Sequence, residues 1–484
     1  MEMQDQKSHS SQKKFNMKTE TVIVGTSLAC LVTAHEIAKK GEQVTLVSNG
    51  GRWGGHFAGV DTCGQHYDAG MAIVELTSRL EEEKPDLADY TIFKRNDVGR
   101  YVHMMERYLD DVTPLRIIDT PQSYYRSTWN DDFLLCNKFQ VFSRWSDSEK
   151  QMVVNDLASR TRSDWRHASN KIAKQNMHEI ASYHEVSHYN HGAHIHQQFI
   201  EPFVNKLTAL DSKEVSSIYH RRLWSPMYYP ETLADAVQGK VESYSNTVIH
   251  YPQGGSFATF PEILIKGIES FENANVVHEK VRSVDSAEKK ISLNNGETIE
   301  YEHIAWGGKL FEAFAAFGTD MIQDYSTQRA NLTFAFAVVD TAKIKKDFSI
   351  LFVLDPNVHA YRITNPTNCA GEDTDKTRIM IEYNSDLLSR RGVVPQQVKN
   401  LSIQTLIQLG IIDNPEAVLD IDVKAIPKLL PIADLHYNEL TNTNIRLLQE
   451  KNPGLSLIGD SSGMSTRSFA DNIVQGLKYA EHRS

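Results

Sequence analysis

The chain has 484 residues, too many for one ordinary domain, so we expect two domains or one domain with a large insertion. Hydrophobic residues make up 40% and charged residues 23%, an ordinary globular balance. The formal net charge of -11 excludes a general nucleic-acid binder. The longest apolar run is too short to cross a bilayer, so we expect no membrane span.

The four cysteines are widely spaced and form no C-x-x-C pair, so a disulfide framework or zinc ribbon is not expected. Residues 1–17 are polar and lack the apolar centre of a secretory signal, and we expect them to form a disordered leader. Both features fit a cytoplasmic protein. Nothing in the sequence specifies the oligomeric state.

The first structured segment predicts a strand, a helix and a second strand. Thr21 to Val24 is a short β-branched run, typical of a buried parallel strand. Residues 27–40 carry apolar side chains at helical spacing and end in two lysines before Gly41, which favours a helix stop. Residues 43–47 predict the next strand. Together they form a βαβ unit.

The turn of this unit departs from the glycine pattern G-x-G-x-x-G, whose helix N-terminus binds pyrophosphate. In Gly25-Thr26-Ser27-Leu28-Ala29-Cys30 only the first glycine is present. Ser27 and Cys30 are small enough for close packing, and Ser27 can cap the helix. The second strand ends in Ser48-Asn49, without the acidic residue that usually binds ribose hydroxyls, so either side chain would be a weaker partner.

Three further segments carry turn and strand-end signals. The pair Gly54-Gly55 and then His56 follow the βαβ unit closely. The segment 251–264, YPQGGSFATFPEIL, begins with a turn and leads into a helix and then a strand. Near the C-terminus a strand ends in Gly459-Asp460, and a loop of small residues leads into a helix that contains Asn472 and Ile473.

These segments together resemble the FAD-dependent amine oxidase-like superfamily, which includes protoporphyrinogen oxidase-like and phytoene desaturase-like enzymes and the UDP-galactopyranose mutases. The glycine pair, the YPxGG…P helix and the terminal GD…NxxxG occur in the order of that family. The resemblance covers the chain ends well and the middle loosely. It implies an α/β fold, with a Rossmann-like FAD-binding domain built from discontinuous segments and an inserted α+β substrate domain.

The same resemblance implies where FAD would lie. Its pyrophosphate would lie near Gly25–Ser27, its ring near Gly54–His56, and its adenine near Val281. Asp460 and Asn472 would lie on the ribityl and ring sides. The cofactor-binding residues that we predict are Gly25, Thr26, Ser27, Ser48, Gly54, Gly55, Val281, Gly459, Asp460, Asn472 and Ile473.

The predicted FAD-binding domain comprises residues 18–85, 248–310 and 450–484, and the predicted substrate domain comprises 86–247 and 311–449. We expect residues 86–247 to be mainly helical and residues 330–385 to form strands. In a flavoenzyme the cofactor carries the redox step, while the protein positions a small-molecule substrate.

Two groups of arginine and aromatic side chains are candidates for binding that substrate. Arg222 lies in a cluster with Arg221, Trp224, Tyr228 and Tyr229, and Tyr361-Arg362 lies on a predicted strand. Arginine binds carboxylate or phosphate with two parallel hydrogen bonds, so an anionic substrate would suit these groups. Core aromatics and interdomain ion pairs are the alternative interpretation. His56, Arg222, Tyr361 and Arg362 are our candidate catalytic residues.

A histidine-rich segment, residues 184–196, suggests a different chemistry. His184-Glu185-Val186-Ser187-His188 matches the zinc motif H-E-x-x-H, and His194 has the spacing of a third ligand. The glycine that such sites need between the second and third histidines is replaced by His191. We therefore favour a solvated or interdomain helix and assign no metal ligand.

The leading hypothesis is an FAD-dependent oxidoreductase that dehydrogenates a small or medium organic substrate at a C–N or C–C bond by hydride transfer to flavin. A redox-neutral flavin enzyme resembling the nucleotide-sugar mutases is the first alternative. A metalloenzyme using the HEVSH segment is the second. A non-catalytic relic of the fold is the third.

Overall fold

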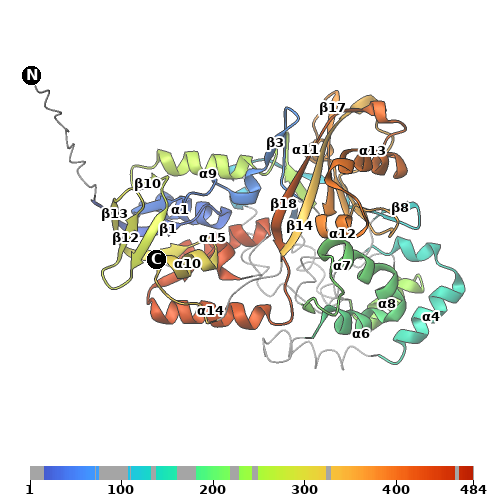
Figure 1. Ribbon diagram of the computed structural model, residues 1–484, viewed down its shortest axis with the longest axis horizontal. Helices are drawn as coiled ribbons and strands as arrows, with labels where there is room; N and C mark the ends of the chain where they lie inside the picture. Colours follow the sequence, from blue (N-terminus) through green and yellow to red (C-terminus); the bar gives the residue numbers. More distant parts are fainter. Residues whose placement is uncertain are drawn as a thin grey trace, which may run out of the picture.

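The computed structural model describes residues 16–70, 72–75, 107–109, 111–131, 138–160, 181–217, 228–241, 249–322, 329–463 and 468–482. Figure 1 shows these residues arranged as two lobes. The first described strand and the last helix lie in the same lobe, although they come from opposite ends of the chain.

The lobe that contains both chain ends is built on a seven-stranded sheet drawn from three separate stretches of sequence. Five of its strands run parallel, and two form an antiparallel hairpin at one edge. In spatial order the strands are β10 (Ala274–Val277), β2 (Val44–Val47), β1 (Asn16–Val24), β13 (Thr298–Trp306), β12 (Lys290–Leu293) and β11 (Val281–Asp285), with β19 (Leu455–Leu457) beside the end of β13. The carboxyl ends of the parallel strands therefore meet at one edge, where α/β proteins bind ligands.

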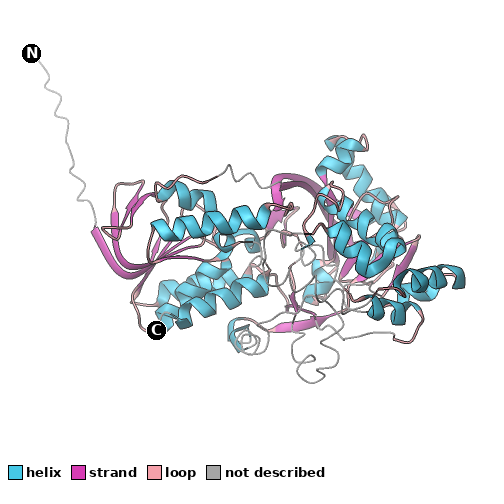
Figure 2. Cartoon of the chain, turned by 90° about the horizontal axis from the view of Figure 1, so that it is seen from below, coloured by secondary structure: helices cyan, strands magenta, loops and turns pink. Residues whose placement is uncertain are grey.

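Helices cover both faces of this first sheet, as Figure 2 shows. Ile23 of β1 packs with one helical layer, whereas Val22 and Val24 pack with the other. Burial on both faces explains the continuous apolar run of β1. The first layer comprises α1 (Leu28–Lys39), α9 (Thr259–Ser270) and α15 (Phe469–His482), and the second comprises α10 (Leu310–Ala316) and α14 (Tyr437–Lys451).

Helix α15 packs directly on α1 and ties the C-terminal segment to the first βαβ unit. A Cβ atom at Gly476 would lie 2.7 Å from Cβ of Val32, so the two helices approach more closely than any side chain at that position would allow. Lys40 Nζ also donates a hydrogen bond of 2.6 Å to the carbonyl of Ala480. The discontinuous sheet is thus held by contacts between its first and last segments.

The other lobe is built on a second seven-stranded sheet, which is mainly antiparallel. The spatial order of its strands is β18 (Val418–Pro431), β14 (Arg329–Asp340), β17 (Lys376–Asn384), β16 (Arg362–Thr364), β15 (Ile350–Val353), β7 (Gln122–Tyr125) and β8 (Thr128–Asn130). Strands β14 and β17 are buried along most of their length, and helix α13 (Val398–Gln408) lies against β18 and β14.

Shorter elements complete the chain. A three-stranded sheet is formed by β5 (Val74–Glu75), β9 (Ile249–Pro252) and β6 (Leu115–Ile118). A separate hairpin is formed by β3 (Val60–Thr62) and β4 (Gln65–Tyr67). The remaining helices are α4 (Asp147–Leu157), α6 (Tyr183–Ile195), α7 (Glu201–Thr208), α8 (Pro230–Val237), α11 (Pro366–Ala370) and α12 (Ser385–Arg390). Single turns are η1 (Gly55–Ala58), η3 (Gln140–Arg144), η4 (His196–Ile200), η6 (Thr341–Lys343), η7 (Pro395–Gln397), η8 (Pro415–Ala417) and η9 (Gly459–Ser462).

The predicted fold class is confirmed, since a Rossmann-like sheet from discontinuous segments stands beside an inserted α+β region. Residues 86–247 are mainly helical where described, as predicted, although β6, β7 and β8 interrupt the helices between 115 and 130. Two local predictions were wrong. The single strand predicted over residues 275–284, after the helix of the 251–264 segment, is instead two strands, β10 and β11, which pair with different partners. Residues 16 and 17, predicted to be in the leader, pair with β13.

Strand β18 and helix α14 were not predicted at all. Charged residues alternate through β18, and Pro427 interrupts it, a combination that does not resemble a core strand. The structure places β18 at the edge of its sheet, where proline is tolerated, and its register with β14 shifts near Leu332. Among the described residues, no helix has the length and apolar character needed to cross a membrane.

Candidate dinucleotide site

The turn between β1 and α1 has room for glycine alone at its first position. Gly25 adopts φ +132°, and a Cβ atom there would lie 2.8 Å from the carbonyl carbon of Gly307 and from the amide nitrogen of Gly308. Its N–H donates to Val47 O at 2.8 Å, and the Gly307 N–H donates to Val24 O at 2.7 Å. Three strand ends thus converge on this turn.

The two glycines that the turn lacks are compensated by glycines on the facing turns. A Cβ at Gly307 would lie 2.1 Å from Sγ of Cys30, and one at Gly459 would lie 2.5 Å from Oγ of Ser27. The side chains of Ser27 and Cys30 therefore occupy space that glycine leaves open after β13 and β19. Close packing of helix and strands is kept, although the glycine pattern is not.

The N-terminus of α1 retains hydrogen-bond donors toward the carboxyl edge of the sheet. Ser27 is the N-cap, and its Oγ accepts from the Cys30 N–H at 3.4 Å and donates to Cys30 Sγ at 3.1 Å. Within the described part of the chain, no hydrogen bond engages the Leu28 and Ala29 amides. Such amides, with the positive end of the helix dipole, favour an anion.

The glycine pair of the second segment lies against this same turn. Gly54 adopts φ +86°, its N–H donates to Thr26 O at 2.8 Å, and a Cβ there would lie 2.6 Å from the ring of Pro261 in α9. Gly55, at φ +56°, is exposed and has nothing near its Cβ position. The predicted neighbours Thr26, Gly54 and Gly55 are therefore brought together.

The carboxylate of Glu312, from helix α10, lies next to the end of β2. Asn49 adopts φ +52°, its Oδ1 accepts from the Val281 N–H at 3.0 Å, and its Nδ2 donates to Glu312 Oε2 at 3.3 Å. Ser48 is buried, and its Oγ accepts from the Gly50 N–H at 3.2 Å. Glu312, on α10, was missed because it lies 263 residues from Asn49.

The C-terminal residues are placed at the same edge. Gly459 and Asp460 begin η9 directly after β19, and the exposed Asp460 carboxylate is close enough to help raise the pKa of the Cys30 thiol, although burial is the main cause. That pKa reaches about 12, so Cys30 is an unreactive thiol. Asn472 and Ile473 lie in the first turns of α15 and are buried.

His56 lies beside this edge and is exposed to solvent. Its ring contacts that of Phe57, with centroids 3.8 Å apart, and Phe57 packs edge-on against Phe469 of α15 at 5.2 Å. A catalytic role for His56 stays a prediction.

Tyr361 and Arg362 both bind the carboxylate of Glu382, which is only 1% exposed. Arg362 donates from Nε and Nη2 at 2.7 Å each, and Tyr361 donates from its hydroxyl at 2.7 Å. Burial lowers the pKa of Arg362, but the charge of Glu382, its hydrogen bonds and the nearby Tyr361 together outweigh burial, so the pKa is raised. This ion pair accounts for two of the three guanidinium nitrogens.

The other predicted arginine cluster is only partly described. Arg222, with Arg221 and Trp224, lies outside the described residues. Tyr228 and Tyr229 are 0% and 4% exposed and belong to the hydrophobic core, which agrees with their alternative interpretation as core aromatics.

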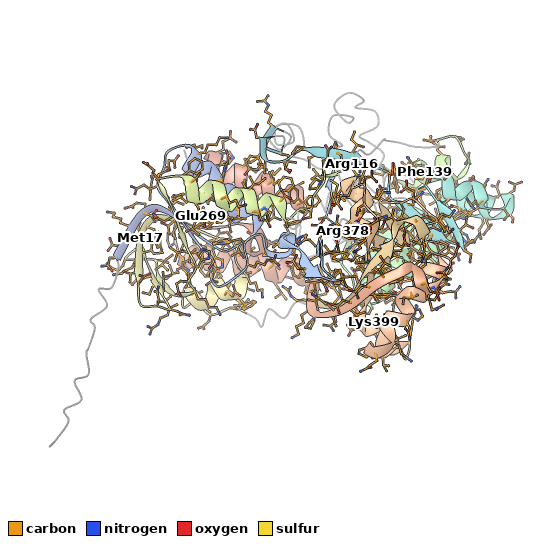
Figure 3. The ribbon with its side chains drawn as sticks, turned by 90° about the horizontal axis from the view of Figure 1, so that it is seen from above. Met17, Arg116, Phe139, Glu269, Arg378 and Lys399 are labelled. Atoms are coloured by element: carbon orange, nitrogen blue, oxygen red, sulfur yellow. The ribbon has the colours of Figure 1, made fainter. Side chains whose placement is uncertain are left out.

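Asp68 is a buried carboxyl that was not predicted from the sequence, and it links the end of β4 to the segment between β9 and α9. Asp68 follows β4, accepts the Phe257 N–H at 3.0 Å, and also accepts the hydroxyl of Tyr251. Burial raises its pKa to about 6, although both hydrogen bonds lower it. Nearby, Arg378 joins β17 to β4 by donating to His66 O at 2.7 Å, and Figure 3 shows Arg378 at the centre of the molecule.

The histidine-rich segment does not form the arrangement of an H-E-x-x-H zinc site, which was the alternative to the solvated or interdomain helix that we favoured. Glu185 is an exposed member of a capping box with Ser182, so it is not a base facing the histidines. His194 contacts Trp145 at 5.1 Å instead of joining the other two. His184 and His188 instead group with His196, with ring centroids 4.7 to 5.7 Å apart.

Comparison with known proteins gives no match to a family model and no match to a curated protein. Solved structures match over nearly the whole chain. A reduced UDP-galactopyranose mutase is 14% identical, with a TM-score of 0.70, over 96% of this chain and 95% of its own. A protein of Exiguobacterium sp. 255-15, provisionally assigned as a protoporphyrinogen oxidase, is 12% identical, with a TM-score of 0.65, over 96% of this chain and 98% of its own.

A cofactor-binding variant of putrescine oxidase is 11% identical, with a TM-score of 0.61, over 97% of this chain and 100% of its own. Identities this low establish the fold and not the reaction. This chain accordingly shares the overall fold of these three proteins, in agreement with the fold that its terminal motifs predicted.

Proposed function

We propose that this protein binds FAD and dehydrogenates a small or medium organic substrate at a C–N or C–C bond. Bound flavin would supply hydride acceptance from the substrate. The observation that carries the proposal is the β1–α1 turn, where Gly25 fits against Gly307 and Gly308 with no room for a side chain. In a dinucleotide cradle the first glycine of the motif makes this tight turn between strand and helix possible.

The residues present fit the group. The Leu28 and Ala29 amides offer donors to the pyrophosphate, with Thr26 beside them. Glu312 lies where Asn49 and Val281 meet, at the end of β2, and is suited to accept the hydroxyls of the adenosine ribose. The lost acidic residue of β2 is thereby replaced from α10, which supports binding despite the altered motif.

On the opposite side of the cradle, Asp460 is suited to accept ribityl hydroxyls, while Gly54, Gly55 and His56 border the proposed ring position. Gly459 leaves the space that Ser27 fills. The N-terminal turn of α15, with Asn472 and Ile473, faces the ring edge in this proposal. Ser48 contributes by fixing the loop after β2 through its bond to the Gly50 N–H.

The substrate would lie between this cradle and the second lobe. Tyr361 and Arg362 lie next to and on β16 of that lobe, and we propose them as candidates for contact with the substrate. Arg222, which lies outside the described residues, is the third candidate. The proposed FAD-binding domain comprises 18–85, 248–310 and 450–484, together with α10 and α14, which pack on the same sheet. The three described cysteines are free thiols, which fits a reducing, cytoplasmic setting.

A redox-neutral mutase is the second candidate, and the similarity to UDP-galactopyranose mutase over 96% of the chain favours it. Dehydrogenation consumes an electron acceptor in every turnover, whereas isomerisation consumes none. Oxygen uptake, or bleaching of an artificial acceptor, in the presence of candidate amines and sugar nucleotides therefore separates the two.

The test of the proposal is the absorbance spectrum of the purified chain before and after addition of FAD. We expect the bands of a bound oxidised flavin, and their loss in Gly25→Ala, whose added Cβ meets backbone atoms at 2.8 Å. Gly41→Ala is the matched control, since Gly41 also has positive φ (+85°) but nothing within 4 Å of its Cβ position. A wild-type protein that stays colourless with excess FAD contradicts the proposal and leaves a relic of the fold.

A further inference from the structure

Three potential metal ligands converge in the helical part of the second lobe, away from the dinucleotide cradle. The ligand atoms of His184, His196 and Glu201 all lie within 4.8 Å of one another. His196 Nε2 is 3.3 Å from Glu201 Oε2. Two imidazoles and one carboxylate form a donor set that suits zinc and related transition metals rather than magnesium or calcium.

The donors point at a common position. His184 Nδ1 and His196 Nε2 are each 3.4 Å from Oγ of Ser212, and that hydroxyl also donates to Glu201. His196 is 2% exposed, whereas His184 and His188 are half-buried. The cluster is therefore anchored in the core and reachable from solvent on the His184 side.

A break in the backbone is what brings these residues together. In an uninterrupted α-helix, His184 and His196 would be about 18 Å apart along the axis. Their ring centroids are 4.7 Å apart, because Gly192, at φ 78° and ψ 163°, interrupts α6 and a π-turn follows. A Cβ at Gly192 would lie 2.5 Å from Asp156 Oδ2, which accepts the Ala193 N–H at 2.7 Å.

A second layer of hydrogen bonds fixes the ring of His196. Its Nδ1 is 3.0 Å from Ser187 Oγ, which is 3.3 Å from His191 Nδ1. His191 Nε2 accepts the Tyr228 N–H at 3.2 Å. With Nδ1 held by Ser187, Nε2 of His196 is directed toward Glu201. Support of this kind is typical of histidines that bind metals.

We propose that His184, His196 and Glu201 bind one divalent transition metal ion of the zinc class, with His188 as the adjacent imidazole on the same helix face. The π-turn supports the proposal, because π-turns concentrate at functional sites. The inference is independent of the flavin proposal, since the two sites lie in different lobes.

The experiment is equilibrium dialysis of the full-length chain against Zn²⁺, with the bound metal and FAD measured in the same sample. We expect one zinc per wild-type chain, and a loss of affinity of about a hundredfold or more in His184→Ala and Glu201→Gln. Visible absorption bands of bound Co²⁺ in the wild type, absent in both variants, would report the same site. Circular dichroism checks that each variant is folded.

Two further variants keep the test decisive. His194→Ala removes a histidine of the same helix that faces Trp145, so zinc binding should be unchanged. Ser212→Ala removes the hydroxyl that lies near His184, His196 and Glu201. Zinc binding should persist in this variant, because the three proposed ligands remain. No zinc in the wild type, an equal loss in His194→Ala, or a complete loss in Ser212→Ala would overturn the proposal.

Discussion

Cys30 and Gly307 fit into each other, since a Cβ atom on Gly307 would lie 2.1 Å from the Cys30 sulfur. Cys30 stands where the third glycine of a dinucleotide turn would be, and Gly307 follows the neighbouring strand β13. In the usual motif a glycine on the β1–α1 turn leaves room for the facing turn. Here the glycine, Gly307, lies on the turn after β13, and the larger side chain, Cys30, lies at the start of α1. The altered pattern is thus compatible with an intact turn.

This fit predicts that Gly307→Ala destabilises the fold and that Cys30→Ala suppresses much of the loss. We expect about 1–3 kcal/mol from overpacking in the single variant. Ile458 Cγ1 and Ser27 Oγ, both 3.2 Å from the same Cβ position, limit the relief. Chemical denaturation of the four proteins in a double-mutant cycle measures the coupling. Additive effects would mean that the two residues do not share this space.

A second prediction concerns Glu312. If its carboxylate accepts hydroxyls of bound FAD, Glu312→Gln weakens FAD affinity about tenfold, the equivalent of ~1.5 kcal/mol for one charge-assisted hydrogen bond. The matched control is Glu269→Gln, an exposed residue of α9 in the same lobe, shown in Figure 3. Fluorescence titration with FAD measures both. Equal affinities for the two variants would remove Glu312 from the site.

A third prediction separates the structural role of Arg362 from a substrate role. Glu382 is buried, and Arg362→Leu would leave its charge with Tyr361 as the remaining partner. Breaking such a buried pair costs about 3–5 kcal/mol, and Arg362→Leu with Glu382→Leu should recover much of it. Denaturation curves measure the stability. If the stable double variant still turns over substrate with an unchanged KM, Arg362 does not bind the substrate.

The sequence predicted the parts of the fold that depend on local pattern. The β-branched run of β1, the spacing of α1 and the small-residue loop after β19 each indicate their structure from adjacent residues alone. Glu312 could not be predicted in this way, because its contact with Asn49 depends on the order of strands in the sheet.

The histidine cluster also depends on a contact that local sequence patterns do not reveal. Helical spacing grouped His184 and His188 correctly but selected His194 as the third member. The break at Gly192 rotates the following turn and presents His196 instead. Glycine at that position signals a break, but the chain alone does not reveal that Asp156 of another helix stabilises it.

The last prediction is a pH dependence set by Asp68. Burial raises its pKa to about 6 from the ordinary 3.8, so between these two values the folded state binds more protons than the unfolded state. Stability should therefore fall as pH rises from 4 toward 7, by an amount of the order of 3 kcal/mol from this group. Asp68→Asn should lack that contribution, so the wild-type curve should decline relative to the variant. Thermal or urea unfolding at a series of pH values measures the difference. A wild type that gains stability relative to the variant over this range would mean that the hydrogen bonds from Tyr251 and Phe257 outweigh burial and keep the carboxylate ionised.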